Sequence, residues 1–181
     1  QALELTDLVR IDHFRGFAGY WEIPASEATA VKGRWAPGPG MALFEALKSD
    51  LGGDLPLIAE DLGVITPDVE ALRDGLGLPG MAILQFAFED TAGGFGCSGF
   101  LPHNHRRALA VYTGTHDNNT LLGWWATLDP SLQRHARLYL NSDGSEIQWD
   151  FIRAALASVA DLALVPMQDL LGLGPEACMN R

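Results

Sequence analysis

The sequence predicts an α/β fold built on a parallel sheet, and three observations support this prediction. Short apolar runs of strand length alternate with segments of helical spacing along the 181 residues. Long helical connections of this kind join parallel strands, because antiparallel neighbours need only short turns. Polar residues stand directly after several of the apolar runs. The hydrophobic share of 48% and the charged share of 19% are typical of a globular chain.

The first part of the chain contains two predicted strands that end in carboxylates. Residues 8–12 (LVRID) form an apolar run ending at Asp12, and residues 55–60 (LPLIAE) form another ending at Glu60. Between them, residues 41–51 have helical spacing and are followed by two glycines, which stop the helix.

A second helix is predicted to begin at Thr66. Thr66 suits the N-cap, Pro67 the first helical position, and Asp68 the positive end of the helix dipole. Gly77 is placed to end this helix. Its apolar stripe consists of Val69, Leu72 and Leu76.

The second part of the chain contains three further predicted strands, over residues 81–88, 108–112 and 162–165. A Gly-rich loop over residues 91–99 is longer than a connector needs to be, which makes it a candidate functional loop. Helical patterns cover residues 120–126, 132–139 and 147–158.

The polar residues at the strand ends are Asp12, Glu60 with Asp61, Gln85, Asp117, and Gln168 with Asp169. This distribution is typical of a (β/α)8 TIM barrel, whose active site lies at the C-terminal ends of the strands. An open doubly wound sheet also binds ligands there, although the chain lacks a Gly-x-Gly-x-x-Gly turn after its first strand.

A complete barrel takes about 250 residues. Residues 1–181 with five strands are therefore predicted to be one partial barrel domain, truncated at both ends. An incomplete barrel exposes strand edges, so such a segment alone is expected to self-associate or to fold poorly.

The spacing of the first two strand-end carboxylates suits cleavage of a glycosidic bond. Retaining cleavage needs a nucleophilic carboxylate and an acid about 5–5.5 Å apart, and adjacent parallel strands lie about 4.8 Å apart. Arg10 alternates with Asp12, so both side chains face one side, where the guanidinium favours the ionised carboxylate. Glu60 follows an apolar stretch, where desolvation favours the protonated acid.

Each of these residues also has a structural interpretation. Strand-end carboxylates commonly cap the next helix, which is what we expect of Asp61 and Asp129. Arg10 and Asp12 would form a structural ion pair. Asp117 is a candidate for binding sugar hydroxyls, and His116 before it is either a partner in that task or a core histidine.

The aromatic residues offer two candidate contacts with a sugar. Trp35 lies in a Pro/Gly-rich loop and is the better stacking platform, whereas Trp124 and Trp125 have the spacing of core residues in a helix. Phe86 is predicted on an inner strand, where core packing competes with substrate contact.

Several other classes of protein are disfavoured. The net charge of −11 without clustered Lys or Arg argues against a nucleic-acid partner, and no apolar run reaches the length of a membrane span. His103 and His105 lack further ligands at metal-site spacing. The two cysteines, Cys97 and Cys178, are distant in sequence and fit a reducing cytoplasm, which is the expected location.

Several motifs, in order along nearly the whole chain, resemble glycoside hydrolase family 77, the amylomaltases or 4-α-glucanotransferases. The motifs are residues 9–16 (VRIDHFRG), 32–35 (KGRW), 37–40 (PGPG), 58–63 (IAEDLG), 85–88 (QFAF), 101–104 (LPHN), 113–118 (TGTHDN) and 165–169 (VPMQD). The resemblance implies a disproportionating enzyme acting on α-1,4-glucans and maltooligosaccharides, with no metal or organic cofactor. It also implies that the five strands are the fourth to eighth of the barrel.

The same resemblance assigns roles to individual residues. Asp12 would be the nucleophile, Glu60 the acid/base and Asp117 the transition-state stabiliser. The residues that would contact substrate are Arg10, His116, Phe86 and Asn180. Two positions depart from the family pattern: Cys178 stands where arginine is common, and His105 where an aromatic residue is usual.

Three functions follow as hypotheses. The first is a transglycosylating enzyme, the second an α-amylase-like hydrolase, and the third a catalytically silent fragment that binds glucan or serves structure. The Asp-His-Phe-Arg-Gly run at residues 12–16 favours the first.

Overall fold

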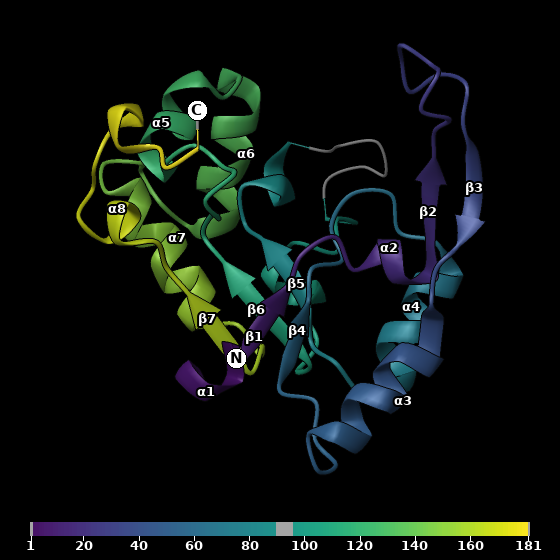
Figure 1. Ribbon diagram of the computed structural model, residues 1–181. Helices are drawn as coiled ribbons and strands as arrows, with labels where there is room; N and C mark the ends of the chain where they lie inside the picture. The colour runs from purple at the N-terminus through teal and green to yellow at the C-terminus, as the bar shows by residue number, and fades with distance from the viewer. Residues whose placement is uncertain (1, 90–95, 181) are drawn as a thin grey trace. The chain divides into compact units, whose positions relative to one another are not determined.

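The computed structural model describes residues 2–89 and 96–180 (Figure 1). The chain divides into two compact units. Unit 1 is Gln1–Met81 and unit 2 is Ala82–Arg181. Residues 91–95 of the Gly-rich candidate loop lie outside the described residues. Both units combine strands with helices, which confirms the predicted α/β class.

Unit 1 places the first two predicted strands side by side. Strand β1 pairs with β4 in parallel, from Val9 opposite Leu57 to Ile11 opposite Ala59. The elements described in this unit are α1 (Ala2–Leu5), β1 (Val9–Ile11), α2 (Arg15–Ala18), β2 (Gly19–Glu22), β3 (Arg34–Pro37), α3 (Gly40–Asp50), β4 (Leu57–Ala59) and α4 (Pro67–Gly75).

The core of unit 1 forms where these strands meet the helices. Phe14 and Phe44 are fully buried with ring centroids 5.6 Å apart, and Val69 and Leu72 of the predicted α4 stripe are buried in the same cluster. Thr66 occupies the N-cap position as predicted, and Gly77 adopts the left-handed φ of +68° that ends the segment.

The antiparallel hairpin of β2 and β3 is absent from the sequence prediction. It holds Trp21 opposite Trp35, with ring centroids 5.5 Å apart, and Arg34 Nε lies 2.7 Å from a Glu22 carboxylate oxygen. Cross-strand pairs of this kind stabilise short strands. The spacing of residues within one segment does not reveal such pairs, because the partners belong to different segments. Trp35 therefore lies on a strand, and its predicted place in a loop was wrong.

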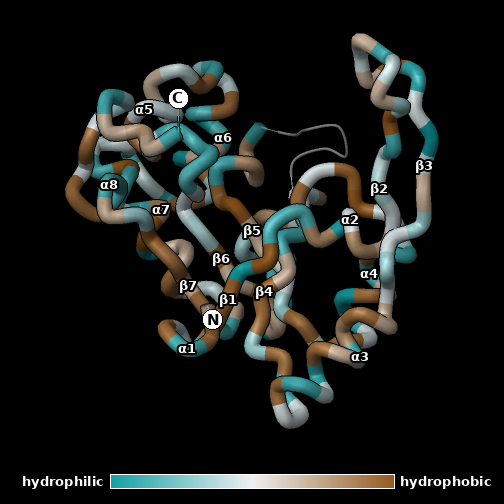
Figure 2. Tube along the Cα trace, in the orientation of Figure 1, coloured by the Kyte–Doolittle hydropathy of each residue, from teal (hydrophilic) through white to brown (hydrophobic). Residues whose placement is uncertain are grey.

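Unit 2 is built on a three-stranded sheet in the order β5–β6–β7. Strands β6 and β7 are parallel, from Ala110 opposite Leu162 to Tyr112 opposite Leu164. Figure 2 shows β5 and β7 mainly in hydrophobic colours. The elements are β5 (Gly80–Ile83, which begins in unit 1), β6 (Leu109–Tyr112), α5 (Leu121–Thr127), α6 (Pro130–Leu140), α7 (Ile147–Leu156), β7 (Leu162–Leu164), α8 (Met167–Leu170), and the 3-10 turns Phe86–Phe88, Pro102–Asn104 and Pro175–Ala177.

The predicted strand over residues 81–88 ends early, at Ile83. The Leu84 N–H still donates to the Tyr112 carbonyl at 2.9 Å, but β6 ends there. The Ala87 and Phe88 N–H groups turn back to the Leu84 and Gln85 carbonyls, both at 3.2 Å. A strand without a neighbour satisfies its backbone locally, so the predicted position of Phe86 on an inner strand was wrong.

The helices of unit 2 begin at side-chain caps. Thr120 Oγ1 accepts the Gly123 N–H at 3.1 Å, and Asp129 Oδ1 accepts the Ser131 N–H at 2.8 Å, which confirms the predicted capping role of Asp129. Trp124 is buried among the core side chains, also as predicted. Within the described residues, no helix is both long and apolar enough to cross a membrane.

Candidate active site

The ends of β1 and β4 bring Asp12 and Glu60 to neighbouring positions. The Glu60 N–H donates to the Ile11 carbonyl at 3.0 Å, and the Phe14 N–H donates to the Glu60 carbonyl at 3.0 Å. Asp12 and Glu60 therefore directly follow the last paired residues of two adjacent parallel strands, which lie about 4.8 Å apart in such a sheet. This confirms the predicted placement of the two residues on neighbouring strand ends.

Asp12 is held by Arg10 and remains open to solvent. Both terminal nitrogens of Arg10 donate to Asp12 Oδ1, Nη2 at 2.6 Å and Nη1 at 3.0 Å. The Asp12 side chain is nevertheless 76% exposed. Exposed ion pairs add only about 0–1 kcal/mol to stability, so the main physical effect of this pair is to orient an accessible carboxylate.

The Glu60 carboxylate is fixed by two backbone donors. Oε2 accepts the His13 N–H at 2.6 Å, and Oε1 accepts the Leu62 N–H at 2.9 Å. His13 adopts a φ of 51°, which is uncommon for a residue with a side chain. Glu60 is half-buried, and these two backbone donors are polar contacts that the apolar stretch before it does not predict.

Asp61 serves the scaffold behind this site. Its buried side chain forms an ion pair with Arg73 of α4, and its Oδ1 accepts the Met81 N–H at 2.7 Å. A Cβ added to Gly80 would clash with the Asp61 carboxylate, which therefore occupies space that only glycine leaves free. The predicted helix-capping role of Asp61 was wrong, because α4 begins at Pro67.

Unit 2 carries a second group of predicted site residues. Asn180 Nδ2 donates to Asp117 Oδ1 at 2.8 Å, and His116 Nε2 lies 3.2 Å from Asp117 Oδ2. The side chains of His116 and Asp117 are both exposed, so His116 is no core histidine. Three residues predicted separately, Asp117, His116 and Asn180, are thus in one polar cluster.

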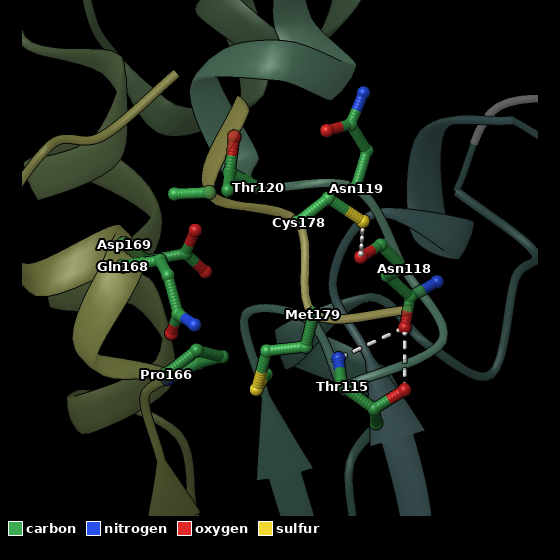
Figure 3. A pocket seen from close by; sticks show the side chains of 10 residues that line it. Thr115, Asn118, Asn119, Thr120, Pro166, Gln168, Asp169, Cys178 and Met179 are labelled. Atoms are coloured by element: carbon green, nitrogen blue, oxygen red, sulfur yellow. Dashed lines mark hydrogen bonds between the residues drawn. The ribbon is translucent and has the colours of Figure 1, made fainter. Parts of the chain in front are cut away.

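Asn118 shapes the loop that carries His116 and Asp117. Its Oδ1 accepts hydrogen bonds from both the backbone N–H and the hydroxyl of Thr115, each at 2.9 Å (Figure 3). Cys178 Sγ contacts the Asn118 carbonyl at 3.4 Å. A cavity of about 10 Å³ remains between these residues and α8. Sequence reasoning did not single out Asn118, although asparagine side chains commonly hydrogen-bond to nearby backbone groups in loops.

Asp169, predicted at a strand end, lies in α8, and its contact with Thr113 places it next to the end of β6. It is 2% exposed, and it accepts the Thr113 hydroxyl at 2.6 Å and the Leu121 N–H at 2.7 Å. Burial raises the pKa of Asp169 above its ordinary range, against the opposing effect of these hydrogen bonds. Through these two hydrogen bonds Asp169 connects Thr113, which follows β6, with Leu121, the first residue of α5.

The remaining candidate residues have other partners. Trp35 is exposed on β3, and Phe86 packs edge-on against Phe100 at 5.6 Å. His103 contacts the Tyr139 hydroxyl at 2.8 Å, while His105 contacts Ser158 Oγ at 2.7 Å. Of the residues that the structure describes, no three His, Cys, Asp or Glu side chains are grouped so that they could hold a metal ion.

A parallel α/β fold with carboxylates directly after adjacent strands defines a class of proteins whose reactive groups gather at the C-terminal ends of a sheet. Residues 1–181 match the sequence model of glycoside hydrolase family 77, described as 4-alpha-glucanotransferase, and the chain belongs to this family.

Individual proteins similar to this chain are described as 4-alpha-glucanotransferases as well. The chain is 52% identical over 188 aligned residues to the 4-alpha-glucanotransferase of Thermus thermophilus, covering 99% of this chain and 37% of the relative. It is 51% identical to the chloroplastic/amyloplastic 4-alpha-glucanotransferase of Arabidopsis thaliana, covering 99% of this chain and 31% of the relative. The chain thus spans about a third of the length of these relatives.

A solved structure supports the fold as well. The amylomaltase from Streptococcus agalactiae in complex with acarbose superposes with a TM-score of 0.91 at 41% identity. The match covers 98% of this chain and 35% of that chain.

Proposed function

We propose that this chain carries the catalytic carboxylates of a 4-α-glucanotransferase that transfers α-1,4-glucan segments with retention. The observation that carries the proposal is the parallel pairing of β1 with β4, which places Asp12 and Glu60 at equivalent ends of adjacent strands. The expected spacing of about 4.8 Å between such strands suits the roughly 5–5.5 Å between the carboxyls of retaining enzymes.

The proposed reaction has two displacements. Asp12 attacks C1 of the sugar, the C1–oxygen bond to the leaving glucan breaks, and protonated Glu60 gives its proton to that oxygen. A glycosyl ester on Asp12 results. The 4-hydroxyl of an acceptor glucan then attacks C1, Glu60 takes up its proton, and the Asp12 carboxylate is released.

The other residues are assigned to substrate binding. Arg10 orients Asp12 through the ion pair described above, and Asp117 with His116 binds sugar hydroxyls and stabilises the transition state. The hydrogen bond from Asn180 supports the orientation of Asp117. The assignment of Asp117 rests on the family motif. Phe86 and Trp35 are proposed as further sugar contacts, and no cofactor enters these steps.

We also propose that β1, β4, β5, β6 and β7 are the fourth to eighth strands of a (β/α)8 barrel, with residues 1–181 as one part of its catalytic domain. In support, β7 is the edge strand of its sheet, and its three residues are exposed. An apolar edge of this kind pairs readily with another chain, which is the basis for proposing self-association. The proposed location is the cytoplasm.

Incubation with maltotriose tests the proposal. Transfer yields glucose together with longer oligosaccharides, whereas a hydrolase yields only shorter products and a silent fragment yields none. Trapping the intermediate with a slow fluorinated glycosyl donor, followed by mass spectrometry, is expected to place the sugar on the peptide that contains Asp12. An adduct on another residue would overturn the assignment.

A further inference from the structure

Unit 1 contains a pocket that none of the proposed catalytic carboxylates lines. It has a volume of about 380 Å³ and is lined by Arg15 of α2, Gly19 of β2, Trp35 of β3, and Thr66 and Asp68 at the start of α4, among others. Ligand pockets are commonly about 300–1,000 Å³ in volume. The pocket is therefore large enough for a small ligand.

One wall of this pocket is an indole that is both exposed and held in place. Trp35 is 58% exposed, and the Arg15 guanidinium lies over one face of its ring, with the guanidinium carbon 4.4 Å from the ring centroid. The Trp21 ring meets it edge-on at 5.5 Å, and the Trp21 Nε1–H donates to the Ala30 carbonyl at 2.8 Å. An aromatic surface fixed before binding loses little conformational entropy when a ligand packs on it.

A polar group of the pocket complements hydroxyl groups. A hydrogen bond from Thr66 holds the pKa of Asp68 below its usual range, so this exposed carboxylate is ionised at neutral pH and accepts hydrogen bonds. A sugar ring presents C–H groups on a face and hydroxyls on its edge, and it thus matches both an indole and this carboxylate.

We propose that this pocket is an auxiliary site that binds a glucosyl residue of an α-1,4-glucan, with the face of Trp35 opposite Arg15 as the stacking surface and Asp68 as a hydroxyl partner. The proposal rests on the proposed function, since the ligand is the same polymer. Holding a long glucan at a second point raises its effective concentration at the reacting carboxylates. The site therefore raises the effective concentration of long glucans at the carboxylates but not that of short glucans, which cannot span both sites.

A titration observed by NMR tests the site directly. The Asp12→Asn variant, labelled with ¹⁵N at its tryptophan indoles and backbone amides, is titrated with maltoheptaose, so that binding is observed without turnover. The Trp35 indole resonance, assigned by its loss in Trp35→Phe, is expected to shift and to saturate. The indole of Trp149, which is exposed on α7, is expected to stay in place and serves as the internal control.

The outcomes separate the two proposals. If the amides of residues 12 and 60 shift while the Trp35 indole does not, the auxiliary site is wrong and glucan binding at the carboxylates stands. If the Trp35 indole alone shifts, the auxiliary site stands and glucan binding at the carboxylates is in conflict with the data. If no resonance shifts, both proposals fail.

Variants of the pocket provide a second measurement. Trp35→Ala and Asp68→Asn, each in the Asp12→Asn background, are expected to weaken maltoheptaose binding at the pocket by about tenfold or more. Asp68 is exposed, so its variant keeps the proposal testable if Trp35→Ala does not fold. Trp149→Ala is the matched control and is expected to leave the affinity unchanged. Equal affinity in all three variants would overturn the proposal.

Discussion

Asp12 and Asp169 both lie close to the C-terminal end of a parallel strand, yet their surroundings are opposite. Asp12 in unit 1 is largely exposed and contacts one guanidinium through a single oxygen. Asp169 in unit 2 is fully enclosed, and both of its oxygens accept hydrogen bonds from the scaffold. The first carboxylate keeps an accessible oxygen, whereas the second has none available.

This contrast shows that the end of a strand does not decide what a carboxylate does. Asp61 makes the same point within unit 1, because it stands next to Glu60 in sequence but is buried against Arg73. A carboxylate that acts on substrate must reach it, and one that stabilises the fold must be enclosed with its partners. Exposure therefore separates the candidate site from the scaffold. Hydrogen-bond partners alone do not, because both Glu60 oxygens also accept backbone hydrogen bonds.

The largest expected effect is the loss of activity on substitution of the exposed Asp12. Asp12→Asn removes the proposed nucleophile while keeping the shape of the side chain, and we expect transferase activity to fall roughly 10⁴-fold or more. The free energy of unfolding is expected to change by less than about 1 kcal/mol, because an exposed ion pair contributes little. Maltotriose assays and urea unfolding measure the two quantities.

A variant that loses both activity and stability would break this contrast, since Asp12 would then act as a scaffold residue. Lys48→Gln is a suitable control for a charge change on the surface of the same unit, because Lys48 lies near the exposed end of α3. It is expected to change neither quantity.

The next largest expected effect is the loss of stability on substitution of the buried Asp169. Asp169→Ala leaves the Thr113 hydroxyl and the Leu121 N–H without their acceptor, and each such group costs about 1–3 kcal/mol. We therefore expect the free energy of unfolding to fall by roughly 2–5 kcal/mol. Urea unfolding checks this value. A fall below about 0.5 kcal/mol, the level of an ordinary surface substitution, would show that water replaces the lost contacts.

The smallest expected effect is the pH dependence of the stability that Asp169 contributes. Because burial raises the pKa of Asp169, the folded state binds a proton more tightly than the unfolded state does. The contribution of Asp169 to stability is thus full below the ordinary pKa of about 3.9 and falls as pH rises through the raised value.

Asp169→Asn removes this titration. We expect the stability of the wild type relative to the Asn variant to decrease as pH rises from about 3.9, and then to level off. Urea unfolding of both proteins across this range measures the difference. A difference that grows with pH would contradict the sign of the pKa shift.

Much of the architecture can be predicted from the sequence alone. The strand and helix segments of unit 1 around Asp12, residues 41–51 and Glu60 appear close to their predicted bounds, because amphipathic spacing and breaking glycines are local properties. The predicted ion pair of Arg10 with Asp12 follows from the same alternation along one strand. The candidate carboxylates were identified in the same way.

The features that were missed depend on partners far along the chain. The β2–β3 hairpin requires Trp21 to meet Trp35, and the end of β5 at Ile83 is set by the length of β6. Likewise, the burial of Asp61 depends on Arg73 and on the space left by Gly80. The spacing of residues shows which groups sit at strand ends. Which of these stay in contact with solvent is decided by the packing of distant segments, because desolvation and hydrogen-bond partners exist only in the folded chain.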